Sequence, residues 1–477
     1  MSESQTGHEL VDPAERTTRP HEFLWIWHSA QFSFGVVVLG SVPVSFGLGW
    51  WGSVTSALVG LLIGTLVFAP LARFGMRTGA TDAVSSAAHF GVRGRLVTTL
   101  ITLCVAIGFF AIALWTGATA VVAALQRLVG WGDLVVVVLP VALAVVLVAI
   151  FGYRALLTTY KTVTVIGGLV LAGLVAALLP GFDAGVAGEP ILGDFWRTWL
   201  LGVSFGVTVP ITYATLQGDY SRHLRPGTTD RQAVWWNGVG MFLSNAIALL
   251  IGIMASTMIT DHSVPWVIGL TDTVPSWFTA FVIVFGFFGT LPQGALCVYA
   301  AGVTANSLFR KASRVTCTVV VAVVGVLVLY LGAVVYDAID SISTFILFLL
   351  LLIAPWSAIM LVGFALRGGR YAPEELLGRS RYWFAGGFDP RAFAAFLPAV
   401  ALGFAFANNS VYIGPLADLA GGVDLSCVVP FAFAGGVYWL LCKAAPVRSS
   451  GTERSGGTSP AEQFPEAELS IGNRRGS

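Results

Sequence analysis

The chain has 477 residues, of which 56% are hydrophobic and only 11% are charged, and its formal net charge at pH 7 is +1. So few charged side chains cannot cover the surface of a soluble globule, which excludes a soluble enzyme or binding domain and predicts an all-α polytopic membrane protein in a lipid bilayer. The near-zero net charge gives no indication of nucleic-acid binding.

Taking about 20 apolar residues per crossing, the sequence predicts twelve membrane spans. They lie at residues 23–48, 52–72, 97–125, 133–151, 161–180, 198–218, 233–259, 276–306, 315–335, 341–366, 391–408 and 426–443. Most arginines and lysines then fall in the loops of one side, whereas only Arg127 and Arg197 fall in the loops of the other. Because basic loops stay in the cytoplasm, we expect cytoplasmic N- and C-termini and a multi-pass protein of the cell membrane.

The polar first residues show no cleavable signal peptide, so residues 1–21 are predicted to be a cytoplasmic arm. Residues 446–477 have the composition of a disordered cytoplasmic tail.

The first span is unusually polar in its first half, Trp27-His28-Ser29-Ala30-Gln31-Phe32, and then reaches Gly40 and Pro43. A buried amide is unfavourable in lipid unless it is paired, so Gln31 is expected to face the protein interior, either in a binding site or in a packing role. His28 is the one titratable side chain well inside a span, and it serves either as a proton carrier or as a satisfied polar group near the interface.

The third span carries Phe109, Phe110 and Trp115 in an otherwise aliphatic run. Such rings either face lipid or stack on a flat heterocycle bound at the centre of the membrane.

The stretch Trp199–Pro226 begins as the sixth span, meets Gly202, Gly206 and Pro210, and ends in a polar signature at Gly218-Asp219-Tyr220-Ser221-Arg222. A helix broken inside the bilayer survives only where its freed amide and carbonyl groups line a protein cavity, so this segment is either a binding site or a kinked packing helix. Interruptions in the first and sixth spans fall at the same position of two five-helix blocks. This predicts a five-plus-five inverted repeat, residues 22–180 and 181–366, with discontinuous helices 1 and 6, followed by a loop and two further helices at 367–445.

The eighth span contains a second polar island, Thr290-Leu291-Pro292-Gln293-Gly294. The Gln293 amide offers both a donor and an acceptor, which suits the edge of a nucleobase, although a glutamine that bridges two helices has the same appearance.

No Asp, Glu, Lys or Arg lies deep in a predicted span, which argues against a carboxylate proton relay. The scattered histidines and the isolated cysteines (Cys104, Cys297, Cys317, Cys427 and Cys442) form no catalytic or metal-binding pattern. We therefore expect no enzyme, no cofactor and no metal beyond a possible sodium ion.

These motifs resemble those of the nucleobase-cation symport family, purine-cytosine permease branch, whose members carry cytosine, purines, uracil, thiamine, allantoin or hydantoins. Trp27–Phe32 resembles the Trp-x-Ser-Ala-Asn-Phe pattern of that family's helix one, and Gly218–Leu224 is similar to its more specific Asp-Tyr-Ser-Arg-Tyr-Leu pattern after helix six. Gln293-Gly294 with Tyr299 and Gly302, and the Gly369-Arg370-Tyr371 loop, also fit. The resemblance spans roughly residues 20–445 and leaves only the termini outside it.

The resemblance implies a twelve-helix secondary active transporter that imports a nucleobase or related N-heterocycle together with a proton or sodium ion. Carried over by position, the substrate-binding residues are Gln31, Phe109, Phe110, Trp115, Ser204, Phe205, Gly206, Thr208, Gln293 and Gly294, and the cation-binding residues are Ser33, Phe34, Gly35 and Thr290. Asp219, Tyr220, Ser221 and Arg222 form the family motif.

Two departures from the family pattern bear on the ion and the substrate. Sodium-coupled relatives place adjacent hydroxyl residues where this chain has Pro292 and Gln293, which favours proton coupling, and the helix-three amide of some members falls near Ala113. An amino-acid or other small-solute symporter of the same fold is the alternative within this class, and a channel or a membrane-embedded enzyme is the alternative from another class.

Overall fold

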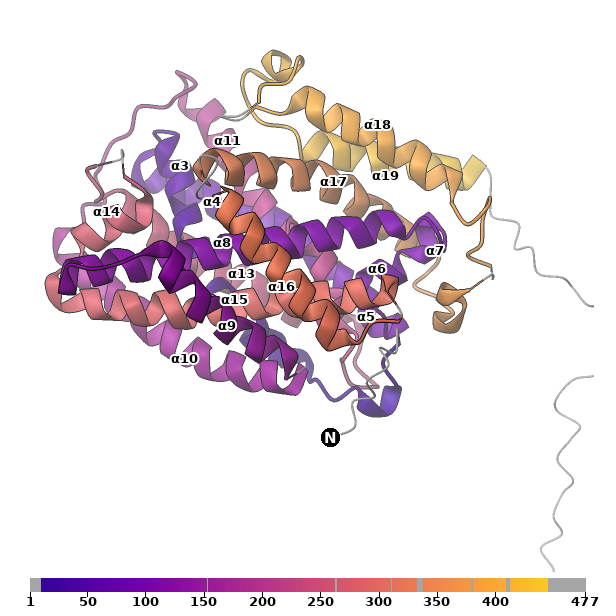
Figure 1. The fold of residues 1–477 in the computed structure, drawn as a ribbon. Helices are drawn as coiled ribbons and strands as arrows, with labels where there is room; N and C mark the ends of the chain where they lie inside the picture. Colours follow the sequence, from indigo (N-terminus) through magenta and orange to yellow (C-terminus); the bar gives the residue numbers. More distant parts are fainter. Residues whose placement is uncertain are drawn as a thin grey trace, which may run out of the picture.

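The computed structural model describes residues 10–444 except 152, 262–263, 310, 333–337, 379–380 and 409–411. The predicted tail and the first nine residues of the predicted arm lie outside these residues. Within the described part the elements are all helical, and extended chain segments meet only in isolated bridges. The long helices form one bundle (Figure 1).

Each predicted span coincides with a helix or a broken helix. The first part of the chain forms α1 (Phe23–Gln31), α2 (Phe34–Val37), η3 (Val38–Gly40), α3 (Ser41–Ser45), α4 (Gly49–Phe68), α8 (Leu96–Val129), α9 (Leu134–Ile150) and α10 (Tyr153–Leu178). The second part forms α11 (Phe195–Ile211), α13 (Asp230–Ser256), α15 (Thr279–Leu308), α16 (Arg314–Tyr330) and α17 (Ala338–Leu366), followed by α18 (Pro390–Phe406) and α19 (Val428–Ala444).

Among the described residues, seven helices are long and apolar enough to cross a membrane, and a bent pair, Pro20–Gln31 with Phe34–Ser45, gives an eighth candidate span. α9, α16, α18 and α19 are apolar but shorter, at 17 residues each. The chain is therefore a multi-pass membrane protein, and a count of twelve crossings depends on these four helices.

Glycines bring α4 against α11. A Cβ on Gly60 would lie 2.2 Å from the Val203 carbonyl oxygen, and one on Gly64 would lie 2.3 Å from the Val207 carbonyl oxygen. Close backbone approach through small residues is the usual way in which membrane helices associate. α13 joins them through Gly252, whose Cβ would lie 1.9 Å from the Val37 carbonyl oxygen of α2. We call α1, α4, α11 and α13 the first helix group.

Close approach at glycines also joins helices of a second helix group, which consists of α8, α9, α15 and α16. A Cβ on Gly117 of α8 would lie 1.9 Å from the Thr290 hydroxyl of α15, and one on Gly302 of α15 would lie 2.2 Å from the Thr318 hydroxyl of α16. α18 and α19 pack together on one side of the bundle, beside α17 (Figure 1).

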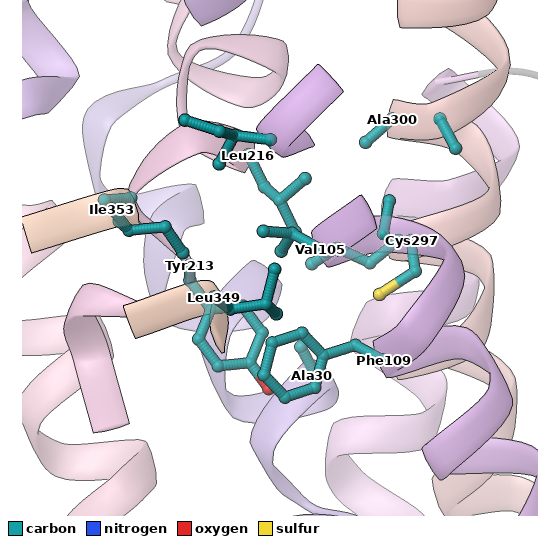
Figure 2. Close-up of a cluster of buried hydrophobic side chains, with 14 of the residues drawn as sticks. Ala30, Val105, Phe109, Tyr213, Leu216, Cys297, Ala300, Leu349 and Ile353 are labelled. Carbon is teal, nitrogen blue, oxygen red and sulfur yellow. The ribbon is translucent and has the colours of Figure 1, made fainter. Parts of the chain in front are cut away.

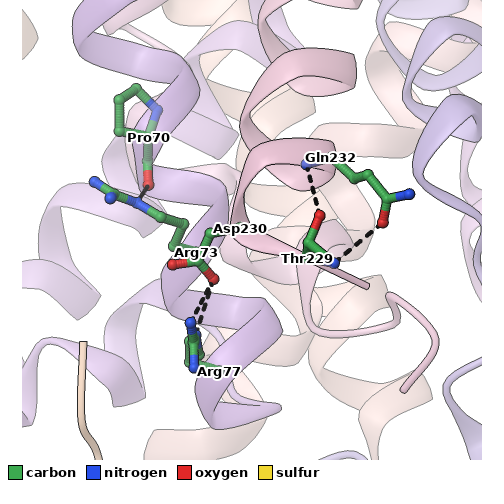
Figure 3. A network of polar contacts seen from close by, with 6 residues as sticks. All are labelled: Pro70, Arg73, Arg77, Thr229, Asp230 and Gln232. Carbon is green, nitrogen blue, oxygen red and sulfur yellow. Dashed lines mark hydrogen bonds and ion pairs between the residues drawn. The ribbon is translucent and has the colours of Figure 1, made fainter. Parts of the chain in front are cut away.

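Short helices gather where the N-terminal arm lies, and we call this region the arm end. They are α5 (Ala72–Thr78), α6 (Asp82–Ser85), α7 (Ala87–Phe90) and α12 (Gly218–Ser221). α13 starts here with a reciprocal cap between Thr229 and Gln232, and Asp230 accepts two hydrogen bonds from Arg77 of α5 at 3.0 and 2.7 Å (Figure 3). Both partners of this ion pair are substantially exposed, so it contributes little to stability.

Candidate functional site

The first predicted helix is broken between Gln31 and Phe34. Phe32 leaves the helical region at φ −81° and ψ 66°, and Ser33 is extended at φ −142° and ψ 154°. The two arms of the broken helix are bent by 80°. A helix that stops and restarts leaves carbonyl groups at one end and N–H groups at the other without helical partners. Since Gln31, Phe32, Ser33 and Phe34 are all buried, the break places backbone dipoles inside the bundle.

Close packing fixes the restarted helix against both α8 and α15. A Cβ on Gly35 would lie 3.2 Å from the Thr116 hydroxyl and 3.4 Å from the Gln293 side-chain oxygen. On the other side of the seam, a Cβ on Gly289 would lie 2.8 Å from the Phe32 carbonyl oxygen. The break in the first helix group therefore faces the second helix group directly.

The sixth predicted span is interrupted one turn later than its glycines suggest. α11 is continuous through Ser204–Thr208 and ends at Ile211, after which the chain turns through Tyr213 into η6 (Ala214–Leu216). Gly206 faces α4, because its Cβ would lie 2.8 Å from the Ala57 carbonyl oxygen. The glycines serve helix packing, and the interruption follows Pro210, whose missing N–H removes the helical donor for the Gly206 carbonyl oxygen.

One side-chain amide connects the two interruptions. The Ser33 hydroxyl donates a hydrogen bond to the Gln293 side-chain oxygen, and the Gln293 Nε2 donates to the Tyr213 hydroxyl at 3.3 Å. Gln293 and Tyr213 are buried, as is Gln31, whose side-chain oxygen has no hydrogen-bond partner. A buried acceptor without a partner is unfavourable unless a further group supplies a donor.

Two aromatic rings lie face to face beside this amide. The ring of Phe109 on α8 stacks on that of Tyr213, with centroids 5.3 Å apart and planes at 17° (Figure 2). Trp27 of α1 meets the Tyr213 ring edge-on at 6.1 Å. The rings thus come from both helix groups, and any movement of one group against the other changes their separation.

The structure separates the remaining sequence-predicted residues into near and distant sets. The near set, at or beside the break in helix 1, consists of Gln31, Ser33, Phe34, Gly35, Phe109 and Gln293. Phe110 and Gly294 turn toward the scaffold: a Cβ on Gly325 of α16 would lie 2.4 Å from the Phe110 ring, and one on Gly294 would lie 2.9 Å from Val145 of α9. Trp115 and Phe205 are only partly buried, and the Thr208 hydroxyl bonds back to the Phe205 carbonyl oxygen at 2.7 Å.

Thr290, predicted to hold a cation, faces away from the break. Its hydroxyl donates to the Gly286 carbonyl oxygen at 2.7 Å and to that of Ala113 on α8 at 3.3 Å. The Ser33 hydroxyl is likewise engaged, with Gln293.

Sequence reasoning missed Tyr213, which takes part in both the hydrogen bonds and the ring stack. The sequence contains a feature that could have identified Tyr213, since it is the first aromatic residue after Pro210. An aromatic side chain one turn beyond a helix breaker in a span lies where the interruption faces the interior.

The family motif lies at the arm end rather than at the breaks. Asp219, Tyr220 and Ser221 are fully buried in α12, and the Arg222 Nη2 donates to the Tyr299 hydroxyl at 3.1 Å. The motif thus connects the end of the interrupted sixth span to α15.

Comparison with known proteins gives concordant matches. A family model described as permease for cytosine/purines, uracil, thiamine, allantoin matches residues 10–429. The putative purine-cytosine permease YxlA of Bacillus subtilis (strain 168) is 25% identical over 447 residues, which cover 91% of this chain and 95% of that protein.

Among solved structures, Mhp1, a nucleobase-cation-symport-1 family transporter in a closed conformation with bromovinylhydantoin bound, matches with a TM-score of 0.75. It is 18% identical, and the match covers 94% of this chain and 98% of that one. A Na⁺-coupled sialic acid symporter matches with a TM-score of 0.61 at 12% identity, over 94% of each chain. These two matches identify the fold.

Proposed function

Because the chain belongs to the family of permeases for cytosine, purines, uracil, thiamine and allantoin and is a transporter rather than an enzyme, we propose that it imports a flat N-heterocycle by symport with a cation. The observation that carries this proposal is the Gln293 amide, which bonds to Ser33 in one interruption and to Tyr213 in the other. An amide at this point can exchange these bonds for bonds to the amide edge of a heterocycle.

The ring faces of the substrate would lie between Phe109 and Tyr213. A flat ring needs van der Waals contact on both faces, roughly 7 Å between the flanking rings at a contact distance of about 3.5 Å each. The centroids are 5.3 Å apart, so the substrate enters by separating the two rings. The Gln31 side-chain oxygen, which has no partner, is available to a ligand N–H.

The transport step follows from the two helix groups. The first group carries Gln31 and is followed directly by Tyr213 in the turn after α11, whereas the second group carries Phe109 and Gln293. Rocking of one group against the other closes the site around a ligand that bonds to both, and a ligand shifts such an equilibrium only by its difference in affinity for the two states. We further propose that the helices make twelve crossings built on a five-plus-five inverted repeat. In this arrangement the arm end lies in the cytoplasm.

A thermal-shift screen tests the proposed substrate class. Purified protein is heated with nucleobases, ureides, vitamins and amino acids, each with and without sodium. A ligand at 100 times its Kd stabilises the folded state by about 2.7 kcal/mol. Stabilisation by one class of N-heterocycle supports the proposal, whereas stabilisation by amino acids alone contradicts it.

Removing one ring of the stack should weaken substrate binding. We expect Phe109→Ala to raise the Kd about tenfold, because the lost stacking and apolar contact are together worth about 1.5 kcal/mol. Phe110→Ala is the matched control, since Phe110 packs against Gly325 of the scaffold. It should lower the melting temperature while leaving the Kd close to that of the wild type. Titration of the substrate in both variants checks this, and a greater loss of affinity in Phe110→Ala would assign the stacking role to Phe110.

We propose protons as the coupling ion. Sodium prefers several oxygen ligands, yet the Ser33 hydroxyl bonds to Gln293 and the Thr290 hydroxyl faces α8. Uptake into proteoliposomes should therefore depend on an imposed pH gradient and be unchanged when choline replaces sodium. A strict requirement for sodium would overturn this assignment.

A further inference from the structure

Two carboxyl groups that sequence reasoning places in connecting loops are completely buried at the arm end. Asp82 of α6 and Asp219 of α12 are both 0% exposed. The Gly218 N–H donates to the Asp82 Oδ2, while the Asp82 Oδ1 and both oxygens of Asp219 have no hydrogen-bond partner. The apolar runs of the predicted spans carry no acidic side chain, but each of these two connecting segments carries one that is buried.

One buried cation is a neighbour of Asp219. Arg222, 5% exposed, lies one turn after Asp219, but its Nη2 donates to the Tyr299 hydroxyl and its Nε has no partner. His223 adds no charge, since burial and the neighbouring Arg222 and Arg16 lower its pKa well below the usual range. Two carboxylates and one guanidinium leave a net negative charge in a buried place. A single proton removes it, and burying an unpaired charge is far more unfavourable than burying a neutral acid.

The charged groups on the other surrounding elements do not compensate this charge. On α5, Arg77 pairs with Asp230 and Arg73 lies over the Phe364 ring at 4.0 Å. On η9 (Pro373–Leu377), Glu375 pairs with Arg381, and on α7 burial keeps the pKa of His89 well below its usual range.

The N-terminal arm closes this place from the outside. The Thr18 N–H donates to the His223 carbonyl oxygen at 3.0 Å, the Arg225 N–H donates to the Thr18 carbonyl oxygen at 3.0 Å, and the Val11 N–H donates to the Gly79 carbonyl oxygen at 2.8 Å. The arm therefore spans from the segment before α6 to the segment after α12. Since both carboxyl groups are 0% exposed, water can reach them only when the segments around them move.

We propose that Asp82 and Asp219 together form a proton-binding site whose occupancy keeps the arm end closed. Opening hydrates the pair, the second carboxyl ionises, and the proton leaves to water; closure requires a proton to return. This inference rests on the proposed function, because it treats the opening of the arm end as a step of transport. It places a titratable site outside the substrate region, close to the end of the interrupted sixth span.

The sign of the pH dependence follows from burial. Burial raises the pKa of Asp219 from its ordinary 3.8 to about 7, and burial together with Asp219 raises that of Asp82. The two groups titrate as a coupled pair, so the proton belongs to the pair. The preference for the closed arm end is fully present below the pKa of the hydrated acid, and it is lost progressively as the pH rises through the raised pKa of the buried pair.

Infrared titration of the purified protein tests the site without any substrate, and so independently of the proposed function. The carbonyl stretch of one protonated carboxyl group should disappear between about pH 5 and pH 8 in the wild type. It should be missing from that range in Asp219→Asn and in Asp82→Asn. Asp230→Asn, which removes the exposed partner of Arg77 instead, should retain it. The same titration in all variants, or none in the wild type, would overturn the proposal.

A distance measurement tests the closure. Spin labels are placed on Ala14→Cys and Lys311→Cys, both exposed positions, in a chain whose five native cysteines are replaced. The wild-type distance distribution should shift toward the open form as the pH rises, whereas Asp219→Asn should remain closed throughout. A wild-type distribution that does not change with pH contradicts the proposal.

In oriented liposomes the source of the proton can then be assigned. Closure on acidifying the arm side identifies a proton taken from that compartment, and closure on acidifying the opposite side identifies the coupling proton. No response to either acidification counts against the site.

Discussion

Gln293→Ala is expected to abolish uptake of the substrate while leaving folded protein in the membrane. The change removes the amide that bonds to Ser33 and Tyr213, together with its bonds to the heterocycle. Each buried polar group left without a partner costs about 1 to 3 kcal/mol. Two such losses correspond to a reduction in affinity on the order of a hundredfold, since about 1.4 kcal/mol is a factor of ten. Uptake of labelled substrate and its thermal shift measure the effect.

The matched control for this variant is Gln126→Ala. Gln126 is an exposed glutamine near the end of α8, where its Nε2 donates to the Gly132 carbonyl oxygen at 3.3 Å. Its removal should leave uptake unchanged. Size-exclusion profiles of both variants separate a loss of binding from a loss of folding. Wild-type affinity in folded Gln293→Ala would remove this residue from the site.

Gly60→Leu should prevent stable folding. A Cβ at this position would lie 2.2 Å from the Val203 carbonyl oxygen and 2.8 Å from the Gly206 Cα, both on α11. These are backbone atoms, so α4 and α11 must separate to admit a side chain, and overpacking of this kind costs at least about 1 to 3 kcal/mol. We expect a large fall in the yield of monodisperse protein and in its melting temperature.

Gly436→Leu is the control for this substitution. Gly436 also lies in an apolar helix, but a Cβ there meets nothing within 4 Å. It should therefore tolerate leucine with little change in melting temperature. Equal stability of the two variants would show that the helices are not held at the distance the glycines allow.

The fold was largely predictable because membrane spans follow from apolar length. Each predicted span coincides with a helix, and the broken first helix was predicted from a polar half followed by Gly40 and Pro43. The interruption itself falls earlier, at Phe32 and Ser33. Composition locates a break in a span but does not fix the residue at which the backbone turns.

The site was less predictable because glycine has two uses in a membrane helix. Gly206 suggested an opening in the sixth span, yet it packs against α4, and the residue that reaches the interior is Tyr213. The two aromatic neighbours Phe109 and Phe110 are indistinguishable in the sequence. They point to different partners only because α8 is packed between the first helix group and α16.

The cover at the arm end is held by main-chain atoms at Val11 and Thr18, and in addition by the side chains of Arg16, which donates to the Met76 carbonyl oxygen, and Thr18, which bonds to the Tyr153 hydroxyl. Hydrogen bonds between backbone groups do not depend on which side chains the paired residues carry. The main-chain part of this cover therefore tolerates changes of side chain at Val11, whereas changes at Arg16 and Thr18 remove side-chain bonds as well. Proline, which lacks the N–H, is the substitution that this arrangement would not tolerate at position 18.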